Sequence, residues 1–184
     1  MNKNFNLPKE ILGENLSLRC HSVSLAQTMF DYIDKDRERL RKFLPWVDHI
    51  SCVEHEKEHI ERCLENWENK TSFAYGLYNR EDIYMGNISI FDFGKSGFYK
   101  CEIGYWILGD FEGHGYMSKA IKLLEEVLFI RGMHRIQIRC STENLRSANI
   151  PKANSYKLDG TQRETIYANE KFHDLLIFSK LSTD

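Results

Sequence analysis

The sequence predicts a mixed α+β fold. Apolar residues recur at helical spacing before about residue 70, and the period changes to two between residues 72 and 108. A further helix then stands between two strands, so the order β-α-α-β-β-β-α-β-α-β-β contains one βαβ crossover. The 184 residues show no repeat and no Pro/Gly/Ser-rich linker. We therefore expect a single domain over residues 1–184.

The first elements are a strand and two helices. Residues 16–20 alternate between apolar and polar, as a strand should. Ser22 or Ser24 is then expected to cap a helix that stops before Pro45. Its apolar positions are Leu25, Met29, Ile33, Leu40 and Phe43. A second, heavily charged helix is predicted over about Glu54–Glu68, with a thin apolar stripe of Ile60, Leu64 and Trp67.

Three strands follow in the middle of the chain. Residues 72–78 and 83–93 are predicted to form an antiparallel hairpin around the turn at residues 79–82. Residues 98–108 form the third strand, after a loop that contains Gly94 and Gly97.

The last part of the chain alternates between helices and strands. A helix is expected from about Tyr116 to Arg131, with Gly132 as its left-handed stop. Residues 135–140 form a strand, and a short helix follows Ser147. Two final strands, at about residues 156–166 and 172–181, are joined across residues 168–170.

The composition excludes several classes of protein. The formal net charge of -2 argues against a dedicated nucleic-acid or anionic-membrane binder. The five cysteines are scattered and include no CxxC pair, which is typical of a reducing compartment. No apolar N-terminal segment and no run of 18 apolar residues occurs, and we predict a cytoplasmic protein. The sequence leaves the oligomeric state, monomer or homodimer, open.

The segment His55-Glu56-Lys57-Glu58-His59 matches H-E-x-x-H, the signature of a zinc-peptidase helix. His55 and His59 would share one helical face, and Cys63 continues it. However, the surrounding stretch is packed with Glu, Lys and Arg, so such pairs are expected by chance on a solvated face. No partner motif follows downstream. We expect no metal site here and keep the peptidase as a remote alternative.

A glycine-containing loop, Gly113-His114-Gly115-Tyr116-Met117-Ser118, lies between a predicted strand and a predicted helix. The unpaired N–H groups at a helix N-terminus can bind phosphate, and glycines let the chain approach it closely. The loop lacks the third glycine of a dinucleotide fold and the Gly-Lys-Ser/Thr of a Walker loop. By itself it is more typical of a tight strand-to-helix connection.

The residues around this loop resemble a known family. Cys101–Leu108 and Glu112–Ala120 are similar to the central motif of GNAT acetyltransferases, and more narrowly to the ribosomal-protein serine/alanine N-acetyltransferase branch. Further segments fit the same branch in order and spacing. These are Leu44-Pro45-Trp46-Val47, Asn144-Leu145-Arg146-Ser147, Asp159-Gly160 and Phe172-His173-Asp174.

The resemblance implies a mostly antiparallel central sheet flanked by helices, with a splayed parallel strand pair that binds acetyl-coenzyme A. The backbone of Trp106, Ile107 and Leu108 would pair with the pantetheine arm, which Asn144 would also touch. Amides from Gly113, His114, Gly115, Tyr116, Met117 and Ser118 would bind the pyrophosphate. The sequence departs from the family at Glu112, where Gln or Arg is usual, and at Ser155-Tyr156, where Gly-Phe is usual. Pro151 stands where many members carry a tyrosine general acid.

Two residues are candidates for proton transfer. Glu102 lies in an apolar strand on the same face as Gly104 and Trp106, and a carboxylate there is costly to bury unless it is paired or used. It is either a general base, acting through water, or a solvent-facing strand residue. Ser147 either protonates the leaving thiolate or caps the helix that follows it.

The acceptor is the least determined part of the prediction. Trp46 and Tyr84 either line its pocket or belong to the core. An α-amino group has a pKa of about 7.7–8.0 and asks less of a base than a lysine near 10.4. We therefore predict transfer of acetyl to a primary amine at a protein N-terminus. A small-molecule amine and a catalytically inactive coenzyme A-binding module are the alternatives.

Overall fold

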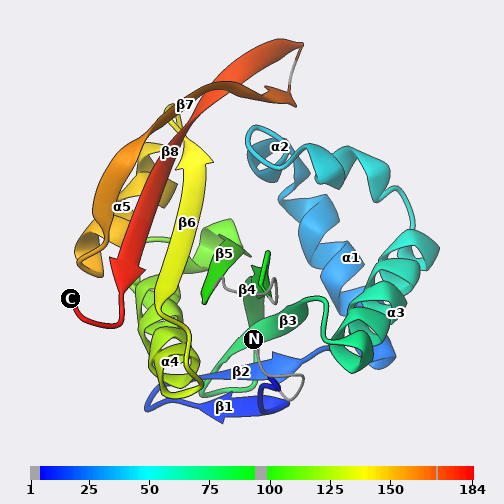
Figure 1. Ribbon diagram of the computed structural model, residues 1–184. Helices are drawn as coiled ribbons and strands as arrows, with labels where there is room; N and C mark the ends of the chain where they lie inside the picture. The colour runs from blue at the N-terminus through cyan, green and yellow to red at the C-terminus, as the bar shows by residue number, and fades with distance from the viewer. Residues whose placement is uncertain (1–4, 94–98, 169) are drawn as a thin grey trace.

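One mixed sheet runs through the molecule, and all strands but one pair are antiparallel to their neighbours. The computed structural model describes residues 5–93, 99–168 and 170–184 (Figure 1). The strand order in this part of the chain is β1-β2-β3-β4-β5-β6-β8-β7. The strands are β1 Glu10–Leu12, β2 Leu16–Cys20, β3 Phe73–Asn79, β4 Tyr84–Phe91, β5 Lys100–Ile107, β6 Arg135–Ser141, β7 Lys157–Ala168 and β8 Lys171–Leu181.

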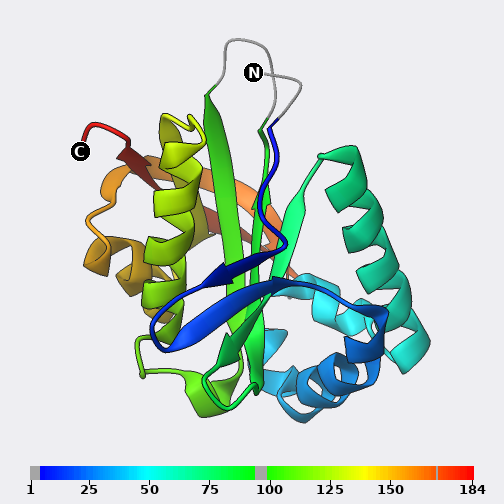
Figure 2. The same ribbon diagram turned by 90° about the horizontal axis from the view of Figure 1, so that it is seen from below.

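Helices cover both faces of this sheet. Figure 2 shows α1 and α3 on one side of the central strands and α4 and α5 on the other. The helices are α1 Ala26–Lys35, α2 Arg37–Leu40, α3 Val53–Asn69, α4 Tyr116–Ile130 and α5 Leu145–Ala153. Short 3-10 turns lie at η1 Val23–Leu25, η2 Pro45–His49 and η3 Gly109–Phe111. The largest apolar cluster packs α4 against the sheet, and a smaller one lies under α1 and α3.

The two parallel strands pair for only part of their length. Pairing of β5 with β6 runs from Lys100 and Arg135 to Ile103 and Ile138, and no pairing is found beyond that point in the described chain. The rest of β5 continues to pair with β4 alone. The edge of β5 that faces β6 is therefore open from Gly104 onward, as the splayed strand pair of the predicted fold requires.

The predicted elements are confirmed except in two places. Strand β1 was not predicted; it has three residues and pairs with β2. The single helix expected up to residue 43 is wrong, because the chain breaks at Asp36 between α1 and α2. The Asp36 carboxylate accepts hydrogen bonds from Arg39 and from the Gly109 amide 2.9 Å away, which ties this break to the end of β5.

The expected helix ends are partly confirmed. Ser22 precedes η1 but its side chain makes no capping bond, and Ser24 lies inside the turn. Gly132 follows α4 with φ +90°, as expected of a left-handed stop. The loop predicted around Gly94 and Gly97 lies outside the described residues. Among the helices that are described, none is long and apolar enough to cross a membrane.

Candidate functional site

A cavity of about 770 Å³ opens where β5 and β6 part. Its walls come from α2 and the segment after it, from the ends of β5 and β6, and from α4, α5 and β8. The cavity thus touches the glycine loop, Glu102, Asn144 and Ser147, which lie far apart in the sequence. The topology brings most of the predicted site residues to one place.

The glycine loop enters α4 in a left-handed conformation. Gly113 has φ +78° and Gly115, the N-cap of α4, has φ +75°. Residues other than glycine rarely adopt such backbone angles, so the glycines are required for the shape of the loop. The first intrahelical bond runs from Lys119 N to Gly115 O, which leaves the amides of Tyr116 to Ser118 without a partner inside the helix. These amides form a site suited to an anion.

Not every loop residue faces the cavity in the same way. Gly113, Gly115, Tyr116, Met117 and Ser118 line it. His114 is exposed, and its ring packs near that of Tyr116 at 6.3 Å.

The end of β5 is only partly available to a ligand. Trp106 and Ile107 line the cavity, but the Leu108 amide donates to Met85 O at 2.9 Å. The Leu108 amide, one of the backbone groups expected to pair with the pantetheine arm, is therefore already paired with β4. The Ile107 carbonyl accepts a hydrogen bond from Arg39 at 2.7 Å.

Glu102 is buried, with 6% of its surface exposed, so it is not a solvent-facing strand residue. Its Oε1 accepts a hydrogen bond from Arg139 Nε at 2.8 Å, and its Oε2 accepts one from Gln137 Nε2 at 3.3 Å. Both partners come from β6. Glu102 and Arg139 also line the cavity. The carboxylate is thus paired and oriented, and it still faces the space in which a substrate would bind.

Ser147 does not cap α5. The cap is Asn144, whose side-chain oxygen accepts a hydrogen bond from the Ser147 amide at 3.1 Å. This leaves the Ser147 hydroxyl free of a capping role, and it donates to the Tyr105 phenol at 3.3 Å. The Tyr105 hydroxyl in turn donates to Ser147 O at 3.1 Å.

Tyr105 was not predicted from the sequence. Burial raises the pKa of Tyr105, so its phenol remains a proton donor at neutral pH. Burial also raises the pKa of the neighbouring Cys140 thiol, an effect that a hydrogen bond from Ser147 partly opposes. Alternation along β5 places Tyr105 on the face of the sheet opposite to Glu102. The phenol reaches Ser147 only because α5 packs on that face. No local pattern could have indicated this contact.

The predicted acceptor aromatics, Trp46 and Tyr84, lie one layer behind the cavity. Each packs against Trp106 with ring centroids 6.0 Å apart, and Trp106 lines the cavity. Tyr84 is 2% exposed, and Trp46 is partly buried. In this structure they pack against Trp106 on the side away from the cavity.

The three residues of the H-E-x-x-H pattern have different surroundings. His55 lies beside Ser51, while His59 contacts the Cys63 thiol at 3.6 Å. Glu56 faces the core with 1% exposure, which corrects the expectation of a solvated face. Within the described residues its two carboxylate oxygens have no hydrogen-bond partner, and no cluster of three or more metal-ligating side chains occurs. Burial raises the pKa of Glu56 to about 7.

A helix N-terminus with unpaired amides, beside an open strand edge and a cavity, is an arrangement suited to a phosphate-bearing coenzyme. Residues 15–157 match the family described as an acetyltransferase (GNAT) domain. The chain belongs to the GNAT acetyltransferases. It is an acetyl-coenzyme A-dependent N-acetyltransferase, and acetyl-coenzyme A is its cosubstrate.

Several named proteins are similar along nearly the whole chain. YdaF of Bacillus subtilis strain 168, provisionally named a ribosomal N-acetyltransferase, is 26% identical over 94% of both chains. The ribosomal-protein-serine acetyltransferase of Escherichia coli K12 is 21% identical over 92% of this chain and 94% of its own. A solved ribosomal L7/L12 α-N-protein acetyltransferase, in complex with coenzyme A, superposes with a TM-score of 0.89 at 22% identity. That match covers 95% of this chain and 99% of the other, and it shows the shared fold.

Proposed function

We propose that the acceptor is the α-amino group at a protein N-terminus, as in the ribosomal-protein branch of the family. The names of the relatives support this class of acceptor. The observation that carries the proposal is the single cavity where the glycine loop, Glu102 and the Ser147–Tyr105 pair meet. An α-amino group, with a pKa of about 7.7–8.0, needs only a modest base. A carboxylate is a weak base, so an α-amino acceptor suits this site better than a lysine acceptor does.

Glu102 is proposed as the proton acceptor for the amine. Acetyl-coenzyme A supplies an activated thioester carbonyl when bound. The acceptor ammonium loses one proton to the Glu102 carboxylate through a water molecule, and the neutral amine forms the new C–N bond as the C–S bond breaks. The amide nitrogen then releases its second proton to solvent. Arg139 and Gln137 act as positioning residues, because they fix the carboxylate against β6. Binding both reactants in one cavity contributes much of the acceleration.

Ser147 and Tyr105 are proposed to return a proton to the leaving group. The Ser147 hydroxyl gives its proton to the thiolate. Its oxygen can then accept a proton from the Tyr105 phenol 3.3 Å away, and solvent reprotonates the phenol. Proline occupies position 151, so the phenol comes from β5 instead of from that helix. The glycine loop and Asn144 are proposed to hold the phosphate and pantetheine parts, while Trp106 separates the cavity from Trp46 and Tyr84.

An acceptor screen tests the proposal by release of free thiol from acetyl-coenzyme A. Peptides that begin with a free serine or alanine should turn over, and the same peptides with a blocked N-terminus and an internal lysine should not. Preference for a polyamine or an aminoglycoside would replace the protein acceptor with a small molecule. Coenzyme binding without turnover on any amine would favour the inactive module.

A further inference from the structure

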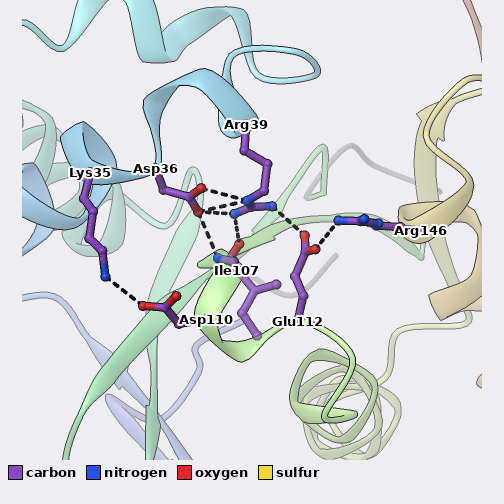
Figure 3. Close-up of polar contacts among 8 residues, drawn as sticks. Lys35, Asp36, Arg39, Ile107, Asp110, Glu112 and Arg146 are labelled. Carbon is purple, nitrogen blue, oxygen red and sulfur yellow. Dashed lines mark hydrogen bonds and ion pairs between the residues drawn. The ribbon is translucent and has the colours of Figure 1, made fainter.

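Glu112, the residue directly before the glycine loop, carries an unexpected negative charge beside the phosphate site. Figure 3 shows that its carboxylate lies between two guanidinium groups. One oxygen accepts a hydrogen bond from Arg39 on α2, and the other accepts one from Arg146 on α5 at 2.6 Å. Glu112 and both arginines line the cavity. The acidic residue therefore gathers two cations at the edge of the loop.

The two arginines are held very differently. Arg39 also donates to the Asp36 carboxylate and to the Ile107 carbonyl, so its guanidinium is fixed from three sides (Figure 3). Its side chain is 29% exposed. Arg146 pairs, among the described residues, with Glu112 alone, and its side chain is 79% exposed. An ion pair that exposed contributes little, so Arg146 can leave Glu112 at small cost.

We propose that Arg146 is a phosphate ligand of the coenzyme and that Glu112 positions its guanidinium at the loop before the coenzyme arrives. A phosphate can accept two parallel hydrogen bonds from one guanidinium. It is also a stronger partner for Arg146 than the Glu112 carboxylate, because Glu112 shares its single charge with Arg39. When Arg146 moves to the phosphate, Arg39 remains hydrogen-bonded to Glu112 and offsets part of its charge. This arrangement explains how a carboxylate can lie beside the pyrophosphate site with its repulsion of the ligand reduced.

The inference rests on the coenzyme site and not on the identity of the acceptor. Its test is therefore equilibrium binding of coenzyme A, by calorimetry, without any amine present. Arg146→Gln should bind coenzyme A about tenfold more weakly than the parent. Arg62→Gln, at an exposed arginine of α3 outside the cavity, is the matched control and should bind like the parent. Thermal unfolding of each variant verifies that the fold is intact.

A double variant separates a phosphate ligand from a mere counter-ion. Glu112→Gln should bind coenzyme A several-fold more tightly than the parent, because it removes a negative charge near the phosphates. Adding Arg146→Gln to this variant should still weaken binding several-fold. If the double variant binds as tightly as Glu112→Gln, Arg146 only neutralises Glu112 and the proposal is wrong.

The phosphate that Arg146 contacts can also be assigned. A loss with coenzyme A but not with 3′-dephospho-coenzyme A identifies the 3′-phosphate, and an equal loss with both identifies the pyrophosphate. Pantetheine, which has no phosphate, should bind the parent and Arg146→Gln equally. An Arg146→Gln defect with pantetheine as large as with coenzyme A would overturn the assignment.

Discussion

Replacing Glu56 by glutamine should stabilise the protein at neutral and alkaline pH. Glu56 is an α3 residue with 1% exposure, and its oxygens have no hydrogen-bond partner in the described structure. On the same face of α3, Val53 and Ile60 belong to an apolar cluster built around Tyr84. Burial raises the pKa of Glu56 from 4.5 to about 7, and Arg62 only partly opposes this. Glutamine keeps the size of the side chain and removes its charge.

The magnitude follows from this pKa. Between pH 4.5 and about 7 the native state binds more protons at this site than the unfolded state, so the free energy of unfolding falls as the pH rises. A shift of that size corresponds to about 3 kcal/mol, which is fully present below pH 4.5 and lost above pH 7. The variant lacks this loss. Its stability relative to the parent should therefore rise by up to ~3 kcal/mol between pH 4.5 and pH 8.

Urea unfolding at several pH values, followed by tryptophan fluorescence, measures this difference. The parent curve alone is not sufficient, because burial lowers the pKa of His21 to about 4. Because His21 is buried in its neutral form, the free energy of unfolding of the protein falls as the pH falls from 6.5 towards 4. This change opposes the effect of Glu56 over nearly the same pH range. Glu65→Gln, at an exposed position of the same helix, should alter stability little at any pH. A pH-independent gap between Glu56→Gln and the parent would refute the reasoning.

Three further predictions concern the site. Glu102→Gln should lower turnover on the order of 10²–10⁴-fold with nearly unchanged coenzyme affinity. The defect should shrink as the pH rises towards the pKa of the acceptor amine, because a deprotonated amine needs no base. A parent-like rate at neutral pH would show that the carboxylate has only a structural role. Tyr105→Phe should reduce turnover less than Ser147→Ala, and neither should recover at high pH, since a higher pH makes protonation of a thiolate no easier; recovery of both at pH 9 would exclude the proposed relay. Gly115→Val should weaken coenzyme binding strongly, because a branched residue is strained at φ +75°, whereas His114→Ala should bind nearly as the parent does; equal effects, measured by calorimetry, would mean that the backbone of the loop is not the ligand.

The regular elements and the loop could be predicted because their causes are local. Period-two alternation identified β3 to β5, and Gly132 fixed the end of α4 through its left-handed conformation. The loop at Gly113 and Gly115 followed from its place between a strand and a helix. The break at Asp36 could not be predicted in this way, because its cause is a contact with Gly109, which is 73 residues away. β1 is too short to give a periodic signal.

The side chains that carry charge were less predictable, since their roles depend on partners from distant elements. Asn144 and Ser147 are three residues apart, and only Ser147 was predicted as a possible cap of α5, although asparagine is also a favourable cap. The structure assigns the cap to Asn144 and leaves the Ser147 hydroxyl for Tyr105. The apolar stripe of α3 was recognised, but Glu56 lies within its buried face, where a charged residue is rarely left unpaired.

Three glutamates show how far the number of arginine partners determines the role of one residue type. Among the described residues, Glu56 has no hydrogen-bond partner, Glu102 has one arginine and Glu112 has two. For a buried carboxylate without a partner, burial favours the protonated form, and a carboxylate with a single arginine remains oriented towards the cavity. A carboxylate between two arginines holds their guanidinium groups beside a site for an anion. The same change to glutamine should therefore stabilise the fold at Glu56, slow turnover at Glu102 and tighten coenzyme binding at Glu112. These outcomes differ although the three side chains are chemically identical.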